Sequence, residues 1–124
     1  MKQRISEAEY INALAIVNQY KAENGNILVV GDITINYDKK EVTRQGKQII
    51  LTSKEYGLLI ALVENRHKVL SRKDLMLLVW SVDFDMGTNT VEVYISFLRQ
   101  KIDKPFTTKV ICTKQGYYFK ANLI

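Results

Sequence analysis

The chain has 124 residues, of which 47% are hydrophobic and 25% charged, and its formal net charge is +5. A chain of this length can bury one hydrophobic core without disulfides or metal ions to stabilise it. Its single cysteine, Cys112, excludes an intramolecular disulfide and a cysteine-cluster zinc site. No apolar run approaches the roughly 18 residues of a membrane span, and no signal-peptide pattern follows Met1. We therefore expect a cytoplasmic protein with no membrane partner, whose basic balance favours a polyanionic partner.

The first predicted element is an amphipathic helix over residues 5–23. Ser6 and Glu9 have the spacing of a capping box, and apolar residues recur at helical spacing from Tyr10 to Val17. The apolar face is wide, so either the rest of the domain or a second subunit in a homodimer must cover it. We divide the chain into this N-terminal segment, residues 1–26, and a domain over residues 27–124.

Four short strands are predicted next. Residues 27–30 are an apolar run, and Ile33, Ile35 and Tyr37 alternate with polar residues, the period of a half-buried strand. Residues 41–44 and 47–51 flank a Gln-Gly pair as a hairpin. The pattern predicts a small antiparallel sheet that needs helices packed on it.

Two helices follow the sheet. The first begins after Thr52, which has capping-box spacing to Glu55, and we expect it to bury Tyr56, Leu59, Ile60 and Val63. The second begins after the N-cap Ser71, and we expect it to bury Leu75, Leu78 and Val79, with Trp80 packed in the core at its end. Residues 67–70 connect the two helices, and residues 81–87 form a loop.

A third helix and a hairpin complete the pattern. Residues 88–102 carry one apolar stripe, made of Val91, Ile95, Leu98 and Ile102. After Pro105, residues 109–113 and 117–121 flank a Lys-Gln-Gly turn as a hairpin. Three helices and a terminal hairpin predict an α+β fold, a winged helix-turn-helix whose third helix reads DNA.

Several motifs stand in order along residues 27–119. They are LTSKEYGLL at 51–59, VLSRKDL at 69–75, Val79-Trp80, NTVEVYISFLRQKI at 89–102 and ICTKQGYYF at 111–119. Together they resemble the OmpR/PhoB-type DNA-binding domain, the effector half of many bacterial response regulators in two-component systems. The resemblance implies a four-stranded antiparallel sheet, three helices and a C-terminal wing. It also implies a transcription regulator, not an enzyme, that binds double-stranded DNA and uses no cofactor or metal.

The resemblance assigns roles to the elements. The helix over 88–102 would enter the major groove, the wing over 109–121 the minor groove, and the loop over 81–87 would touch RNA polymerase as in some members. The Ser71 cap beside Arg72 and Lys73 also suits a phosphate. The residues expected at DNA are Arg72, Lys73, Asn89, Thr90, Val93, Ser96, Phe97, Arg99, Gln100, Lys101, Thr113, Lys114, Gln115 and Tyr117.

This sequence departs from the family at several positions. Ser96 and Phe97 stand where the family often has arginines in the recognition helix. Gln115 replaces a wing arginine, and Tyr118 a second glycine. We also expect no receiver domain before the matching range. The outward helix face is therefore nearly neutral, and affinity is expected mainly from phosphate contacts.

The outward face of the third helix admits three interpretations. Asn89 or Gln100 can pair with adenine while Val93 or Phe97 contacts thymine methyl groups. Alternatively, Val93 and Phe97 form an apolar knob for a protein partner, which makes the chain a protein-interaction module with weak DNA binding. In the third interpretation Phe97 folds inward as core.

Arg99 admits two interpretations as well. Its guanidinium either contacts a phosphate or forms an ion pair with an acidic neighbour, Glu55 or Glu92.

Enzyme chemistry finds little support. His67, the only histidine, lies among basic residues in a predicted solvated loop, and no serine or cysteine constellation completes a triad with it. Cys112 is expected to be a small core residue. Asp83 and Asp85 are interpreted as a solvated loop pair. We therefore predict no catalytic site.

Overall fold

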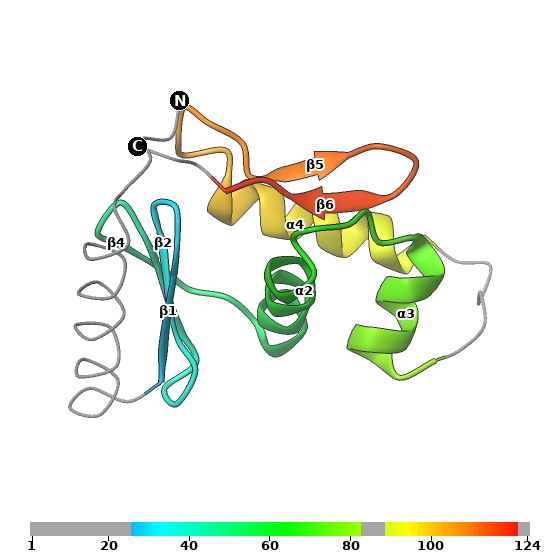
Figure 1. Ribbon diagram of the computed structural model, residues 1–124, viewed down its shortest axis with the longest axis horizontal. Helices are drawn as coiled ribbons and strands as arrows, with labels where there is room; N and C mark the ends of the chain where they lie inside the picture. Colours follow the sequence, from blue (N-terminus) through cyan, green and yellow to red (C-terminus); the bar gives the residue numbers. More distant parts are fainter. Residues whose placement is uncertain (1–25, 83–88, 122–124) are drawn as a thin grey trace, which may run out of the picture. The chain divides into compact units, whose positions relative to one another are not determined.

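The computed structural model describes residues 26–82 and 89–121, which belong to two compact units, residues 26–48 and 49–121 (Figure 1). The predicted helix over 5–23 and most of the loop over 81–87 lie outside the described residues. Among the helices that are described, none is long and apolar enough to cross a membrane.

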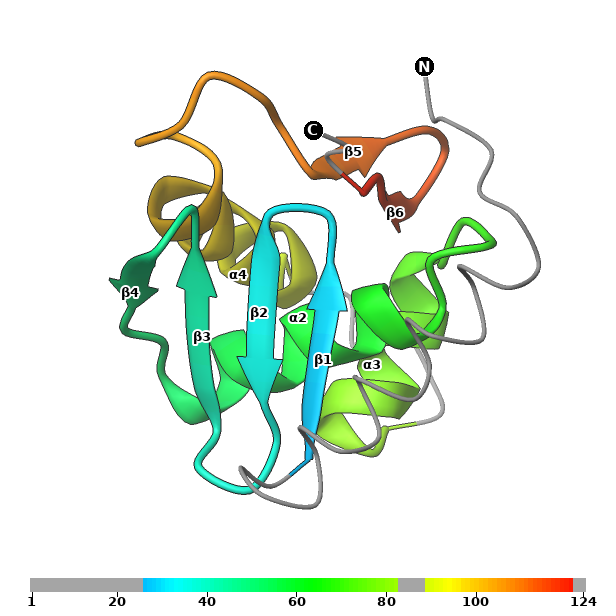
Figure 2. The same ribbon diagram turned by 60° about the vertical axis from the view of Figure 1, so that its left-hand side comes forward.

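The first unit is the predicted antiparallel sheet. Its strands are β1 (Ile27–Val30), β2 (Ile33–Asn36), β3 (Glu41–Arg44) and β4 (Lys47–Ile49), in the order β1-β2-β3-β4 (Figure 2). The predicted alternation is confirmed, because Ile33 and Ile35 are buried, as is Val42, the cross-strand partner of Ile35. One face of the sheet is therefore apolar.

A buried ion pair fixes the first turn of this sheet to its third strand. The Arg44 side chain is fully buried, and its Nε lies 3.1 Å from Asp32 Oδ2. Gln45 Nε2 donates to the same oxygen at 2.8 Å. A buried charge must be paired and hydrogen-bonded, and this carboxylate meets both needs.

The second unit contains three helices and a hairpin. The helices are α2 (Ser53–Glu64), α3 (Arg72–Trp80) and α4 (Thr90–Ile102), and the hairpin is β5 (Ile111–Thr113) with β6 (Tyr117–Phe119). Both predicted N-caps are confirmed, at Thr52 for α2 and at Ser71 for α3, and each helix begins with a reciprocal capping box.

The buried stripes of the first two helices differ from the prediction. α2 buries Leu58 and Leu62 together with the expected Leu59 and Val63, while Tyr56 and Ile60 are only half-buried. On α3 the prediction for Leu78 is wrong, because this side chain is 53% exposed. α3 buries the expected Leu75, together with Met76 in place of Leu78. At about 100° per residue, Leu78 lies roughly 110° from the centre of the stripe formed by these two residues and the half-buried Val79.

The predicted stripe of α4 is confirmed at all four positions, which are less than 2% exposed: Val91, Ile95, Leu98 and Ile102. This stripe packs α4 against α2, while the hairpin lies beside α4 (Figure 1). Leu70, in the connector between α2 and α3, exchanges two backbone hydrogen bonds of 2.8 Å with Tyr117. The connector therefore extends the hairpin on its β6 side.

Candidate nucleic-acid interface

The side of α4 opposite its buried stripe is exposed and carries no charge. Asn89, Ser96 and Gln100 are exposed, Val93 is half-buried, and Phe97 is 42% exposed. We call these five residues the outer face of α4. Their side chains offer amide, hydroxyl and apolar groups, the chemistry that base edges in a major groove recognise.

Phe97 stays 42% exposed beside the ring of Tyr94. Its ring lies edge-to-face on Tyr94, with centroids 5.6 Å apart, and Tyr94 makes the same contact with Trp80 of α3 at 5.3 Å. The interpretation of Phe97 as core is therefore wrong. Trp80 is half-buried and packs against Tyr94 as a structural residue, which joins the end of α3 to α4.

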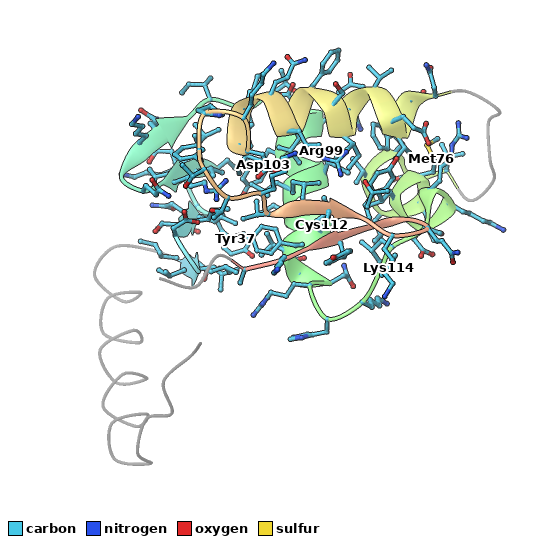
Figure 3. All side chains as sticks on the ribbon, turned by 90° about the horizontal axis from the view of Figure 1, so that it is seen from above. Tyr37, Met76, Arg99, Asp103, Cys112 and Lys114 are labelled. Carbon is cyan, nitrogen blue, oxygen red and sulfur yellow. The ribbon has the colours of Figure 1, made fainter. Side chains whose placement is uncertain are left out.

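Arg99 connects α4 to the hairpin (Figure 3). Its Nε and Nη2 donate to the Ile111 carbonyl at 3.2 and 3.1 Å, and Nη2 also donates to Thr113 Oγ1 at 2.6 Å. The guanidinium lies 5.8 Å from the centroid of the Tyr117 ring. The expected ion pair with Glu55 or Glu92 is wrong, because these contacts direct the guanidinium to β5.

Lys101 lies on another side of α4, against the first turn of α2. Its Nζ is 2.5 Å from Oε1 of the buried Glu55. Burial works to raise the pKa of Glu55, but the hydrogen bonds from Lys101 and the Thr52 backbone, with the Lys101 charge, hold that pKa below its usual value. Lys101 therefore pairs with α2 and does not belong to the outer face.

The N-terminus of α3 presents the two predicted cations, with Lys73 exposed and Arg72 half-buried. Arg72 Nη2 lies 3.7 Å from Glu92 Oε1 on α4. Asp74 already stands at this helix end, where its carboxylate accepts from the Ser71 N–H at 2.9 Å. That hydrogen bond is the main reason why the pKa of Asp74 is lowered, with further help from nearby lysine charges. A phosphate bound at the N-terminus of α3 would therefore lie beside the Asp74 carboxylate.

The hairpin turn presents Lys114 and Gln115 to solvent. Gln115 adopts a left-handed conformation with φ 50°, and Lys114 N donates to Gly116 O at 2.9 Å. Tyr117 is half-buried, and burial raises its pKa, as does the charge of Glu92, so its hydroxyl stays protonated and able to donate.

A groove of about 740 Å³ lies between α4 and the hairpin. It brings together five of the predicted residues, namely Ser96, Arg99, Gln100, Thr113 and Tyr117. Lys104 and Lys109, outside the predicted set, line it as well. α4 and the hairpin therefore form one continuous surface, whose lining includes two lysines.

Two features of this region are not predicted by the sequence pattern. Asp103, directly after α4, is buried, and its oxygens accept from the Val110 and Ile111 N–H groups at 2.8 and 3.1 Å. A second cleft, of about 270 Å³, lies between the connector and the hairpin turn. Its lining is Arg66, His67, Lys68, Val69, Lys114 and Tyr118, and we call it the connector cleft. Three consecutive basic residues, 66–68, are the signal in the sequence that marks it.

The expectation for Cys112 is wrong. This residue is half-buried on β5 and lies opposite Tyr118 in the hairpin register. His67 is exposed, as predicted.

Comparison with known proteins gives consistent matches. The family model described as "Transcriptional regulatory protein, C terminal" matches residues 46–119. The chain is 36% identical over 101 residues to the transcriptional regulatory protein PcoR of Escherichia coli, covering 82% of this chain and 45% of PcoR. It is 46% identical over 81 residues to the probable transcriptional regulatory protein TcrX of Mycobacterium tuberculosis, covering 65% of this chain and 35% of TcrX. The chain thus spans less than half the length of these relatives.

A solved structure has the same fold. It is the DNA-binding domain of Klebsiella pneumoniae RstA in complex with the RstA box, with a TM-score of 0.68 and 26% sequence identity. The similarity covers 76% of this chain and 96% of that domain.

Proposed function

Because this chain belongs to the family of C-terminal domains of transcriptional regulatory proteins, which bind DNA, we propose that α4 enters the major groove of double-stranded DNA. The β5–β6 hairpin then enters the adjacent minor groove. The observation that carries this proposal is the uncharged outer face of α4, continuous with a groove that has lysines at its edge.

Base reading is assigned to the outer face. Asn89 and Gln100 pair their amides with adenine, Ser96 donates or accepts a single hydrogen bond, and Val93 and Phe97 contact thymine methyl groups. With no arginine on this face, guanine is not read by the usual bidentate contact. The proposed site therefore favours A·T-rich sequences.

Phosphate contacts are assigned to the residues around this face. Lys73 and Arg72 at the start of α3, Lys114 on the hairpin turn and the Tyr117 hydroxyl are suitably polar or charged. Arg99 is assigned a positioning role, because it holds β5 against α4 through Ile111 and Thr113. Lys101 supports α2 and is not assigned to DNA.

Fluorescence anisotropy with a labelled, mixed-sequence duplex tests the proposal. We expect a Kd of about 1–100 μM at physiological salt, tighter binding in low salt and a steep loss of affinity as salt rises. Gln100→Ala should change the preference among A·T-rich and G·C-rich duplexes, whereas Lys73→Gln should weaken all of them alike. Absence of duplex binding in this range, from a folded protein, refutes the proposal.

A second candidate function is favoured by one observation, the exposed ring of Phe97 on a surface it shares with Tyr94. In this alternative the outer face of α4 binds a protein partner. Phe97→Ala discriminates between the two, because it should abolish partner capture yet leave duplex affinity and its salt dependence unchanged if the alternative holds.

Three further roles belong to the same proposal. The loop over 81–87 contacts RNA polymerase, the helix over 5–23 forms a homodimer, and the protein acts in the bacterial cytoplasm, where its DNA lies. Sedimentation tests the dimer, because a chain that starts at Asn26 should be monomeric while the full chain is not. An unchanged oligomeric state removes the dimer role.

A further inference from the structure

The connector cleft gathers cations from two segments that are distant in the sequence. The cations Arg66 and Lys68 come from the connector after α2, where His67 also lines the cleft, and Lys114 comes from the turn of the hairpin. In the described part of the chain, no aspartate or glutamate lines this cleft. Its volume of about 270 Å³ admits a phosphate group with its waters but not a large organic ligand.

Backbone contacts hold the two walls of the cleft together. Leu70 and Tyr117 exchange a pair of hydrogen bonds, each 2.8 Å long. Gly116 lies so close to the connector that a Cβ atom on it would be 2.6 Å from the Leu70 carbonyl oxygen. Arg66 is oriented as well, because its Nη1 donates to the Val63 carbonyl at 2.9 Å. The backbone positions of the two walls and the Arg66 side chain are therefore fixed before any ligand arrives, which lowers the entropy that binding costs.

The cleft lies on the opposite side of the hairpin from α4. Arg99 contacts the hairpin from α4 through Ile111 and Thr113. Lys114 lies on the side of the hairpin that faces away from α4, toward the connector (Figure 3). A hairpin inserted into a minor groove has one DNA strand on each side of it. The strand on the α4 side meets the α4–hairpin groove, and the other strand meets the connector.

We propose that the connector cleft binds a backbone phosphate of the DNA strand on the far side of the hairpin, with Lys68 and Lys114 as its cations. This inference rests on the proposed function, since it needs the hairpin in the minor groove. It adds Arg66 and Lys68, with His67 beside them, to the interface.

Lys68→Gln tests the cleft, with Lys39→Gln as the matched control. Both lysines are exposed, and both substitutions remove one positive charge, but Lys39 lies in the β2–β3 turn of the first unit. Binding of a labelled, mixed-sequence duplex is measured by anisotropy between about 50 and 200 mM salt. One lost phosphate contact lowers the slope of log K against log salt by about 0.9, so the affinity ratio of wild type to Lys68→Gln should change about 3.5-fold across this range. Lys39→Gln should match wild type, and Lys68→Arg should restore the slope.

The possible outcomes separate the two proposals. If Lys114→Gln lowers the slope and Lys68→Gln does not, the hairpin contacts DNA but the connector cleft does not, and the inference is wrong. If no folded variant, wild type included, binds the duplex, the proposed function and the inference fall together.

A further experiment titrates the protein with inorganic phosphate and follows the amide chemical shifts of residues 66–70 and 114–118. If phosphate perturbs these amides but Lys68→Gln leaves the duplex slope unchanged, the cleft binds a free anion and the DNA assignment is overturned. If duplex perturbs the same amides in wild type but not in Lys68→Gln, the assignment is supported. Equal melting temperatures of the variants ensure that a changed slope does not reflect partial unfolding.

Discussion

Asp103 is expected to be among the most sensitive positions of the second unit, although no DNA contact is assigned to it. Its buried carboxylate accepts the N–H groups of Val110 and Ile111, both less than 2% exposed. Asp103→Ala leaves two buried donors without an acceptor, at about 1–3 kcal/mol each, so we expect a loss of about 4 kcal/mol in the free energy of unfolding. Asp103→Asn keeps one acceptor and should lose about half as much.

Urea unfolding followed by circular dichroism measures this loss. With an m-value of about 1.5 kcal/mol/M, the midpoint for Asp103→Ala should fall by roughly 2.7 M. Asp38→Ala is the control, since this exposed carboxylate accepts one backbone N–H, from Asn26, at 3.0 Å. Water can replace that acceptor, so the control should lose at most about 1 kcal/mol. If both variants lose the same amount, burial of the Asp103 hydrogen bonds does not determine their strength, and the reasoning is refuted.

Three other predictions follow from contacts in the same unit or from a comparison with the sheet. Gly116→Ala should lower the melting temperature more than Gly46→Ala. Both glycines have positive φ, but of the two only Gly116 has a backbone atom, Leu70 O, in the way of an added Cβ. Equal shifts in thermal scans would show that the hairpin turn moves freely. The pKa of Glu55 is lowered, so the stability it contributes is present above its ordinary pKa of 4.5 and lost as pH falls through the lower folded value. The difference in unfolding free energy between wild type and Glu55→Gln should therefore shrink in urea titrations from pH 7 to pH 3, and a constant difference contradicts the Lys101 pairing. Arg99→Met should weaken duplex binding without changing its salt slope, since the guanidinium is held by β5; a slope lower by about 1 would make Arg99 a phosphate contact.

Local patterns in the sequence predicted most of the secondary structure. The capping boxes at Thr52 and Ser71 and the stripe from Val91 to Ile102 depend on residues three or four positions apart, so they are visible without a fold. The motif order in residues 51–119 predicted the winged helix and DNA binding. The exposed polar positions of the outer face followed from the same helical period, because a buried stripe determines which side chains point away from it.

Pairings between distant residues were decided only by the tertiary structure. Lys101 and Arg99 are two positions apart on one helix, yet one pairs with Glu55 in α2 and the other with a carbonyl and a hydroxyl of β5. The exposure of Leu78 and the presence of Lys68 and Lys114 in one cleft likewise depend on which segments pack next to each other. Helical and strand periodicity specifies the direction of a side chain about its own element. The partner found in that direction depends on how the chain folds back, and the sequence carries no local signal for it.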